Sequence, residues 1–347
     1  MELEFNKRFI TSEFESPFEN FKTVNVTGEV RICPLSGHVT RLLPIRLKQF
    51  APVDWAPVIA RSKELGCPFC PESLESRTPR FPKFYGLETG RIRIGSSTVF
   101  PNAFPYDEHC AVVVFTKEHY LAPGQFTPSM LKEALAACLL YVQRAVDVVP
   151  RTKQVIVNWN YMPLAGAGIV HPHLQAAVLP EFTAYYRLIV EKQKQYSPDG
   201  QKSIFDDFAA GEMAAGHRYV VSYGKWRWIT AFAPRGVYEF WGVSTDPKVG
   251  LDLSDGDLEA LARGICGVLK FMESKGLPAF NLSCYFVFKP PIAGLRNWIA
   301  ITPRVNFPVL GTSDVNYFDR LHGESITFVS PEDLTLEIRA YLEKQGR

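Results

Sequence analysis

One order of strands and helix occurs twice along the 347-residue chain. A strand, a long amphipathic helix and two more strands lie between Pro105 and Pro180, and the same order returns between Pro234 and Pro303. The opening prolines are 129 residues apart and the closing prolines are 123 residues apart. This spacing predicts an internal duplication, in which one folding unit is present in two copies.

The helices of the two copies are marked by apolar residues at helical spacing and by capping residues. The pattern predicts one helix over 129–146, opened by Thr127, and another over 257–273. A further helix is predicted from Ser330 to about residue 344. Two shorter helices within 182–216 are predicted to link the copies, with these residues facing inward: Tyr185, Leu188, Ile189, Ile204, Phe205 and Phe208.

The composition disfavours several classes of protein. The 38 Lys and Arg residues against 36 Asp and Glu leave a net charge of +2, far from the strongly basic balance of a nucleic-acid coat. No apolar run approaches the roughly 18 residues of a membrane span, and the first residues lack the apolar core of a secretory signal. The 7 cysteines are mostly scattered, which argues against a disulfide framework. We therefore expect a cytoplasmic protein that binds neither nucleic acid nor a membrane.

Cys67 and Cys70 are separated by two residues. This interval allows both sulfurs to lie about 2.3 Å from one zinc ion. The alternatives are a redox pair or two small core residues, but histidines further along the chain favour zinc. A tetrahedral site needs two more ligands, for which the candidates are His109, His119, His171 and His173.

A second cluster, His171-Pro172-His173 followed by Gln175, lies at the start of a predicted strand. Alternation along the strand places both imidazoles and the amide on one face. One imidazole can then be a metal ligand and the other a nucleophile, while the neutral amide donates to a phosphoryl oxygen without supplying a proton. The alternative is a histidine pair with a purely structural duty. The second copy has Arg296-Asn-Trp298 at the corresponding place, which predicts one working site per chain and no second metal site.

The segment Asn160-Tyr-Met-Pro-Leu-Ala-Gly-Ala-Gly-Ile-Val-His-Pro-His-Leu-Gln175 resembles the active-site segment of the galactose-1-phosphate uridylyltransferases. These enzymes are a branch of the histidine-triad superfamily in which His-Pro-His-x-Gln carries the reaction. The similarity spans most of residues 29–345, because Trp228 to Phe240 resembles the strand pair that opens the second half in the family and three further segments resemble its motifs. They are Arg31-Ile-Cys-Pro-Leu-Ser-Gly37, Val99-Phe-Pro-Asn-Ala-Phe-Pro105 and Phe115-Thr-Lys-Glu-His119.

This resemblance implies an α+β fold of two tandem histidine-triad-like halves, each an antiparallel sheet with packed helices. It implies a catalytic half at 1–181, a helical linker at 182–216 and a degenerate half at 217–347, and it implies a homodimer. The residues that it implies are Cys67, Cys70, His119 and His171 as zinc ligands, His173 as the nucleophile, Gln175 as the contact to the transferring phosphoryl group, and Arg46, Asn102 and Asn160 as contacts to the nucleotide.

The activity implied by the resemblance is that of a nucleotidyltransferase in nucleotide-sugar and galactose metabolism. It moves a nucleoside monophosphate between a nucleoside diphosphate sugar and a sugar 1-phosphate through a covalent intermediate on His173. The chain departs from the family at Gly168, where a serine is usual, at Gln49, where a second arginine is usual, and over 314–324, which contacts the hexose in the family. Two alternatives stay open: a phosphorylase of adenine nucleotides, either an ADP-sugar or a diadenosine polyphosphate, and a zinc-stabilised protein that binds or senses nucleotides without turnover.

Overall fold

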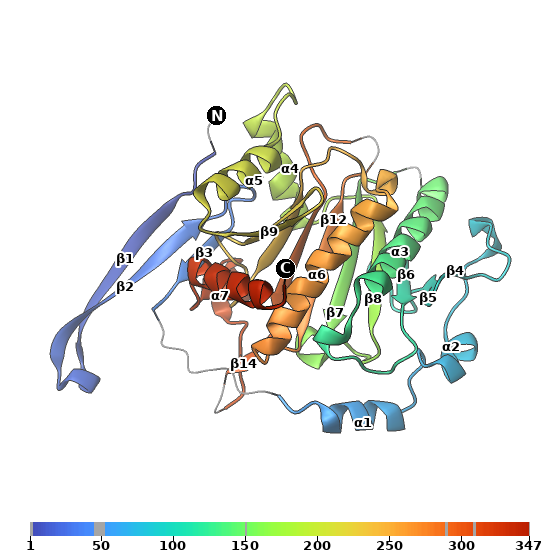
Figure 1. Ribbon diagram of the computed structural model, residues 1–347, viewed down its shortest axis with the longest axis horizontal. Coiled ribbons are helices and arrows are strands. Elements are labelled where there is room, and N and C mark those ends of the chain that lie inside the picture. Colours follow the sequence, from blue (N-terminus) through green and yellow to red (C-terminus); the bar gives the residue numbers. More distant parts are fainter. Residues whose placement is uncertain (1–2, 45–52, 150, 289–290, 308–309, 347) are drawn as a thin grey trace.

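A long antiparallel sheet forms the centre of the protein in the computed structural model, which describes residues 3–44, 53–149, 151–288, 291–307 and 310–346 (Figure 1). Within these residues the sheet has 10 strands. Their spatial order is β4 (Ile92–Ile94), β5 (Ser97–Pro101), β6 (His109–Val114), β8 (His173–Leu179), β7 (Gln154–Tyr161), β12 (Phe280–Phe286), β13 (Trp298–Pro303), β11 (Phe240–Ser244), β10 (Trp226–Thr230) and β9 (Tyr219–Tyr223).

The predicted duplication is visible in the register of this sheet. β7 of the first half pairs with β12 of the second, and Asn158 lies directly opposite Ser283. Asn158 also pairs with Gln175 on β8, and Ser283 pairs with Ala300 on β13, so each partner in the second half is 125 residues after its counterpart. The two halves are therefore related by an approximate two-fold axis through the β7–β12 seam. The prediction of two tandem antiparallel halves is confirmed.

Two long helices cover one face of the sheet, one from each half. They are α3 (Pro128–Val148) and α6 (Asp255–Ser274), which lie side by side in Figure 1. The Thr127 hydroxyl accepts a hydrogen bond from the amide of Met130, and Ser254 caps α6 in the same way. Apolar side chains of both helices and of the sheet form one continuous core that includes Trp159 and Phe280. Both helices were predicted within two residues of their observed ends.

The helices α4 (Ala184–Tyr196) and α5 (Ile204–Ala215) pack on the opposite face, over the second half of the sheet only. Two short helices are therefore present in the segment 182–216, where they were predicted. Leu188 was expected to face inward, but it is 46% exposed, because the helical repeat places Tyr186 and Ile189 against the sheet instead. The same face of the first half stays uncovered by these helices.

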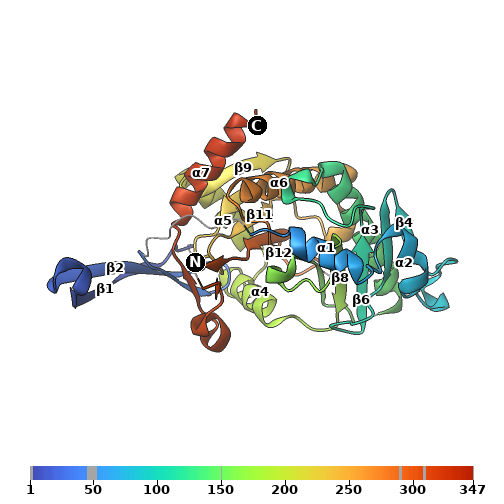
Figure 2. The same ribbon diagram turned by 90° about the horizontal axis from the view of Figure 1, so that it is seen from below.

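A second sheet carries a long hairpin. Its strands are β1 (Lys7–Ser16), β2 (Lys22–Ile32), β3 (Val39–Leu42) and β16 (Ser325–Thr327), and β16 runs parallel to β3. β1 and β2 project away from the rest of the protein (Figure 2), and most of their side chains are exposed. The remaining elements are α1 (Ala56–Glu64), α2 (Pro71–Arg77), α7 (Pro331–Lys344), the strand pair β14 (Asn306–Phe307) and β15 (Thr312–Ser313), and a π-helical turn at Phe318–His322. Within the described ranges, no helix combines the length and the apolar character of a membrane span.

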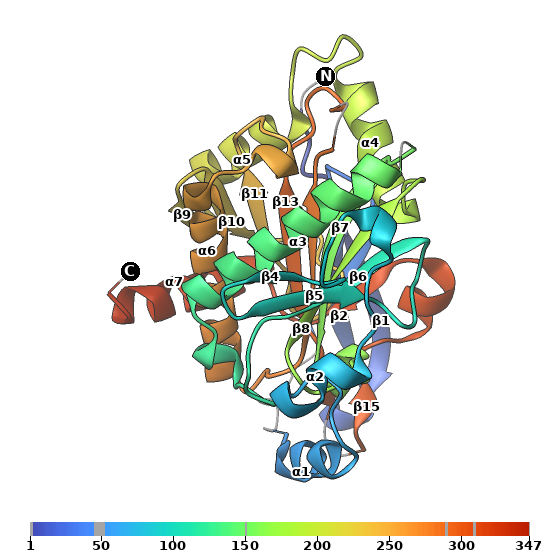
Figure 3. The same ribbon diagram turned by 90° about the vertical axis from the view of Figure 1, so that its right-hand side faces the viewer.

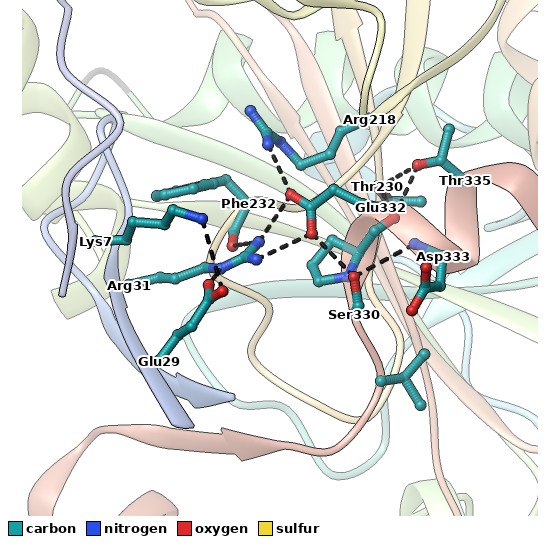
Figure 4. Close-up of polar contacts among 12 residues, drawn as sticks. Lys7, Glu29, Arg31, Arg218, Thr230, Phe232, Ser330, Glu332, Asp333 and Thr335 are labelled. Carbon is teal, nitrogen blue, oxygen red and sulfur yellow. Dashed lines mark hydrogen bonds and ion pairs between the residues drawn. The ribbon is translucent and has the colours of Figure 1, made fainter. Parts of the chain in front are cut away.

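A buried cluster of charges fastens the hairpin to the C-terminal helix. Arg31 at the base of β2 donates two hydrogen bonds to the carboxylate of Glu332 on α7, at 3.0 and 2.9 Å. Arg218 donates to the same carboxylate at 2.8 Å, and Figure 4 shows Glu332 between the two guanidinium groups. Arg31, the first residue of one family-like motif, is only 3% exposed and therefore serves the fold at this place.

Candidate functional site

Four side chains from three separate segments converge beside the first half of the sheet. Cys67 and Cys70 directly precede α2, which Figure 3 shows beneath β5, and His119 and His171 come from two loops. One potential ligand atom from each lies within 4.8 Å of the others. The Cys70 sulfur is 3.3 Å from Nδ1 of His119 and 3.6 Å from Nδ1 of His171, and the Cys67 sulfur is 3.8 Å from the latter.

Both imidazoles turn Nδ1 toward the sulfurs because Nε2 is held by another group. Nε2 of His171 donates to the carbonyl of Thr116 at 2.9 Å. Nε2 of His119 is 2.7 Å from the Ser62 hydroxyl, which itself donates to the carbonyl of Ile59. Such partners fix the tautomer and leave the Nδ1 lone pair for a cation. Nothing in the sequence pattern had indicated Ser62 or Thr116.

The charges of this cluster fit a divalent cation. Burial and the neighbouring Cys67 raise the pKa of the Cys70 thiol to about 12, and burial lowers the pKa of His171 to about 4. Burial lowers the pKa of His119 as well, so both imidazoles are neutral, as metal ligands must be. The Cys70 thiol loses its proton at neutral pH only where a positive charge compensates the thiolate, as a bound divalent cation does. Tetrahedral coordination at about 2.0–2.3 Å separates ligand atoms by roughly 3.5 Å, close to the distances found here. These four residues could hold a metal ion.

His173 is the first residue of β8 and carries its proton on a defined nitrogen. Its Nδ1 donates to the carbonyl of His171 at 2.8 Å, which leaves Nε2 with its lone pair. Burial lowers the pKa of His173, so the ring is neutral. Phe69 lies edge-on to the His173 ring, with ring centroids 5.1 Å apart, and His173 is 7% exposed. Since β8 begins here, strand alternation relates His173 to Gln175 but does not set the direction of His171.

The predicted amide contacts lie along one face of the sheet. The side-chain nitrogen of Asn102, just after β5, is 3.5 Å from the amide oxygen of Gln175. Asn158, which alternation along β7 could have indicated, pairs with Gln175 on the neighbouring strand. Asn160 lies two residues after Asn158 on β7 and accepts a hydrogen bond from Asn281 at 2.8 Å. Arg46 lies outside the described residues, as does Gln49.

Cys67, Cys70, His119 and His171 are called the metal-type cluster below. His109, one of the histidines that the sequence left open as a ligand, is not part of it. His109 is the first residue of β6, and its Nδ1 is 2.7 Å from the hydroxyl of Tyr85. The ring therefore has a structural partner away from the cysteines.

No protein-family model matches the chain. An uncharacterized protein from Archaeoglobus fulgidus is 30% identical over 315 residues, which cover 90% of this chain and 91% of that protein. An ADP-glucose phosphorylase from Arabidopsis thaliana, solved with bound ADP-glucose, is similar with a TM-score of 0.68 and 18% identity, over 90% of this chain and 98% of that chain. A uridylyltransferase structure is similar with a TM-score of 0.65 and 17% identity, over 92% and 99% of the two chains.

The likeness to these solved structures concerns the fold, which extends over nearly the whole of each chain. It agrees with the resemblance to galactose-1-phosphate uridylyltransferases that the motifs indicated. The chain belongs to one family with the Archaeoglobus fulgidus protein, and its fold is that of the galactose-1-phosphate uridylyltransferase group.

Proposed function

We propose that the protein is a nucleotidyltransferase that moves a nucleoside monophosphate between phosphorylated partners through a covalent bond to His173. The observation that carries this proposal is the hydrogen bond from Nδ1 of His173 to the His171 carbonyl. It fixes the tautomer in which Nε2 is the nucleophile. A neutral imidazole in this tautomer needs no base before it attacks phosphorus.

The reaction consists of two displacements at one phosphorus. The Nε2 lone pair of His173 bonds to the α-phosphorus of a nucleoside diphosphate sugar, and the bond to the bridging oxygen breaks, which releases a sugar 1-phosphate. An oxygen of an incoming phosphate monoester then bonds to the same phosphorus, and the phosphorus–nitrogen bond breaks. The Gln175 amide, two residues away on the same strand face, donates to a phosphoryl oxygen in both steps.

The metal-type cluster would hold zinc in a structural role. Two thiolates and two imidazoles are a common donor set for zinc, and four protein ligands leave no position for a water. The cluster nevertheless supports the chemistry, because His171 belongs to it and its carbonyl orients His173. Asn102, Asn160 and Arg46 are proposed to contact the nucleotide.

The substrates are proposed to be a nucleoside diphosphate sugar and a sugar 1-phosphate or another phosphate acceptor, bound by a homodimer. This class of substrate is supported by the ADP-glucose bound to the similar phosphorylase and by the similar uridylyltransferase. Since only 7% of His173 is exposed, neighbouring side chains must move aside before a nucleotide can reach Nε2.

The proposal is tested by trapping the intermediate. Metal-loaded protein is mixed with nucleotides labelled at the α-phosphorus, with UDP-glucose, ADP-glucose and a diadenosine polyphosphate as separate arms, and acid-labile, base-stable label is measured. We expect label on the wild type and on His109→Ala, and none on His173→Ala. The arm that labels fastest identifies the base, and therefore separates a uridylyltransferase from a phosphorylase of adenine nucleotides.

Two other outcomes would contradict the proposed transfer through His173. Equal label on His173→Ala and the wild type would exclude His173 as the nucleophile. Tight nucleotide binding without label or exchange in any arm would instead identify a protein that senses nucleotides without turnover.

A further inference from the structure

A cavity of about 360 Å³ lies over the second half of the sheet. Its floor is formed by Ser283 and Tyr285 on β12 and by Ala300 and Thr302 on β13. Arg235, before β11, and Arg304, after β13, form parts of its wall. The segment from Asp314 to Arg320 closes its outer side. The volume is within the range of small-molecule sites, which is roughly 300–1,000 Å³.

The position of this cavity follows from the two-fold relation between the halves. Ala300 corresponds to Gln175 and Ser283 corresponds to Asn158, as the strand register shows. The cavity therefore occupies the second half's counterpart of the candidate transfer site. Because Ala300 is smaller than the amide at the corresponding place, the floor of the cavity has room there.

This second location contains no counterpart of the nucleophile. The residue that corresponds to His173 is Trp298, two positions before Ala300. It is 1% exposed and stacks on Tyr285 with ring centroids 4.1 Å apart. A ligand in the cavity can be bound but not attacked by an imidazole.

The charged groups of the wall are held in place and offer both donors and acceptors. The Arg235 guanidinium donates to the buried carboxylate of Glu239 at 2.9 and 2.7 Å and lies 4.1 Å from the ring centroid of Tyr185. Arg304 donates two hydrogen bonds to the carboxylate of Asp314, both 2.8 Å long. These contacts fix two guanidinium groups beside the cavity before any ligand arrives.

The outer rim is held less firmly than the wall, because within the ranges that the structure describes the Asp319 carboxylate accepts one hydrogen bond, from the amide of Asn316 at 3.3 Å. Arg320 is exposed, and its guanidinium has no polar contact among the described residues. Asp319 lies beside it, and both side chains line the cavity. Three arginines against two aspartates give the lining a net charge of +1. Guanidinium groups bind phosphate, while carboxylates repel a bare anion but accept hydrogen bonds from hydroxyl groups.

From these observations we propose that the cavity is a second binding site, specific for a sugar phosphate. The phosphate lies against the arginines, and the sugar hydroxyls donate to Asp319. The site is separate from the transfer site, because three strand spacings, roughly 14 Å, lie between Ala300 and Gln175. The proposal does not depend on nucleotidyl transfer by His173.

The experiment is calorimetric titration of the metal-loaded 347-residue chain. Glucose 1-phosphate, inorganic phosphate and AMP are titrated separately into the wild type, Arg320→Gln, Asp319→Asn and Gln175→Ala. The matched control is Arg263→Gln, which removes an exposed arginine from α6 on the other face of the sheet. Thermal midpoints of all variants are measured in parallel, so that a folding defect is recognised.

We expect saturable binding of glucose 1-phosphate that weakens at least tenfold in Arg320→Gln, stays unchanged in Arg263→Gln and persists in Gln175→Ala. Asp319→Asn should weaken glucose 1-phosphate but not inorganic phosphate. The proposal is overturned if no ligand binds saturably, or if Gln175→Ala abolishes binding while Arg320→Gln retains it. Equal affinity for inorganic phosphate, or a preference for AMP, would overturn the assignment to sugar phosphates.

Discussion

His171 and His173 are two residues apart, yet their protons are on different nitrogens. His171 donates from Nε2 to Thr116 and turns Nδ1 to the cysteines, whereas His173 donates from Nδ1 and keeps Nε2 free. The acceptor for His173 is the carbonyl of His171 itself. The proposed nucleophile is therefore oriented by a residue of the metal-type cluster. A change in the geometry of that cluster should alter the orientation of the His173 ring at the transfer site.

Replacement of one cysteine should remove both the metal and much of the stability. In Cys70→Ser we expect a zinc content near zero and a thermal midpoint lower by at least about 5 °C, because the cluster joins three segments of the chain. Metal content by mass spectrometry and thermal unfolding test this. Cys110→Ala, which removes a buried thiol outside the cluster, should keep its zinc. Equal zinc in wild type and Cys70→Ser would contradict the assignment of the ligands.

The labelling of His173 should depend on pH in a defined direction. Burial lowers the pKa of this imidazole, so the nucleophilic neutral form persists below the ordinary value of about 6.5. The rate of labelling should therefore be constant from pH 8 to about 6.5 and fall only at lower pH. A midpoint above pH 7 would mean that the ring is stabilised as a cation and that its environment is not the one described here.

The sequence predicted the residue types of the site better than their partners. Cys67 and Cys70 were found from spacing alone, but spacing left four histidines open as the other ligands, and only the resemblance selected His119 and His171. The tautomers of the two rings depend on Ser62 and Thr116, which come close only through the tertiary fold. No pattern in one sequence marks a serine or a carbonyl as the partner of a distant imidazole.

At the scale of elements, the charge cluster at Glu332 should make stability depend on acid. Burial alone would raise the pKa of Glu332, but the guanidinium groups of Arg31 and Arg218 outweigh it and lower that pKa to about 2. A carboxyl with a lowered pKa in the folded state stabilises the fold above its unfolded pKa of about 4.3, and this contribution is lost as the pH falls toward 2.

Glu332→Gln should therefore be less stable than the wild type by about 1.5–3 kcal/mol at neutral pH, the usual loss for hydrogen bonds to charged groups. The difference should shrink as the pH falls from about 4.3 to 2. Chemical unfolding at several pH values measures it, with Glu343→Gln, an exposed position on the same helix, as the control. A difference that is the same at every pH would show that the effect comes from packing.

Elements with strong local signals were predicted well, and elements that depend on distant contacts were not. Thr127 and Ser254 mark their helices in any context, because a cap bonds to an amide three residues away. The hairpin of β1 and β2 went unassigned, and Leu188 was placed on the wrong side of α4. Which side of a short helix is buried depends on the sheet beneath it, and one sequence does not supply that.

At the scale of the molecule, the two halves should stay together after the chain is cut between them. A protease site inserted between Pro198 and Asp199, in the turn that separates α4 from α5, breaks the covalent link but not the β7–β12 pairing or the core shared by α3 and α6. We expect the cleaved protein to elute in size-exclusion chromatography with the intact protein and to separate only in denaturant. Two independent folded fragments in native buffer would contradict a shared core.

The seam between β7 and β12 also bears on how the molecule acquired its asymmetry. Asn158 faces its own counterpart Ser283 across the seam, so two identical separate chains could pair there in the same register. Such a pair is bound by symmetry: whatever changes at one centre changes at the other. Once both units are in one polypeptide, each centre mutates independently. Fusion thus permits a division of labour, in which His173 is kept in one unit while its counterpart becomes the buried Trp298.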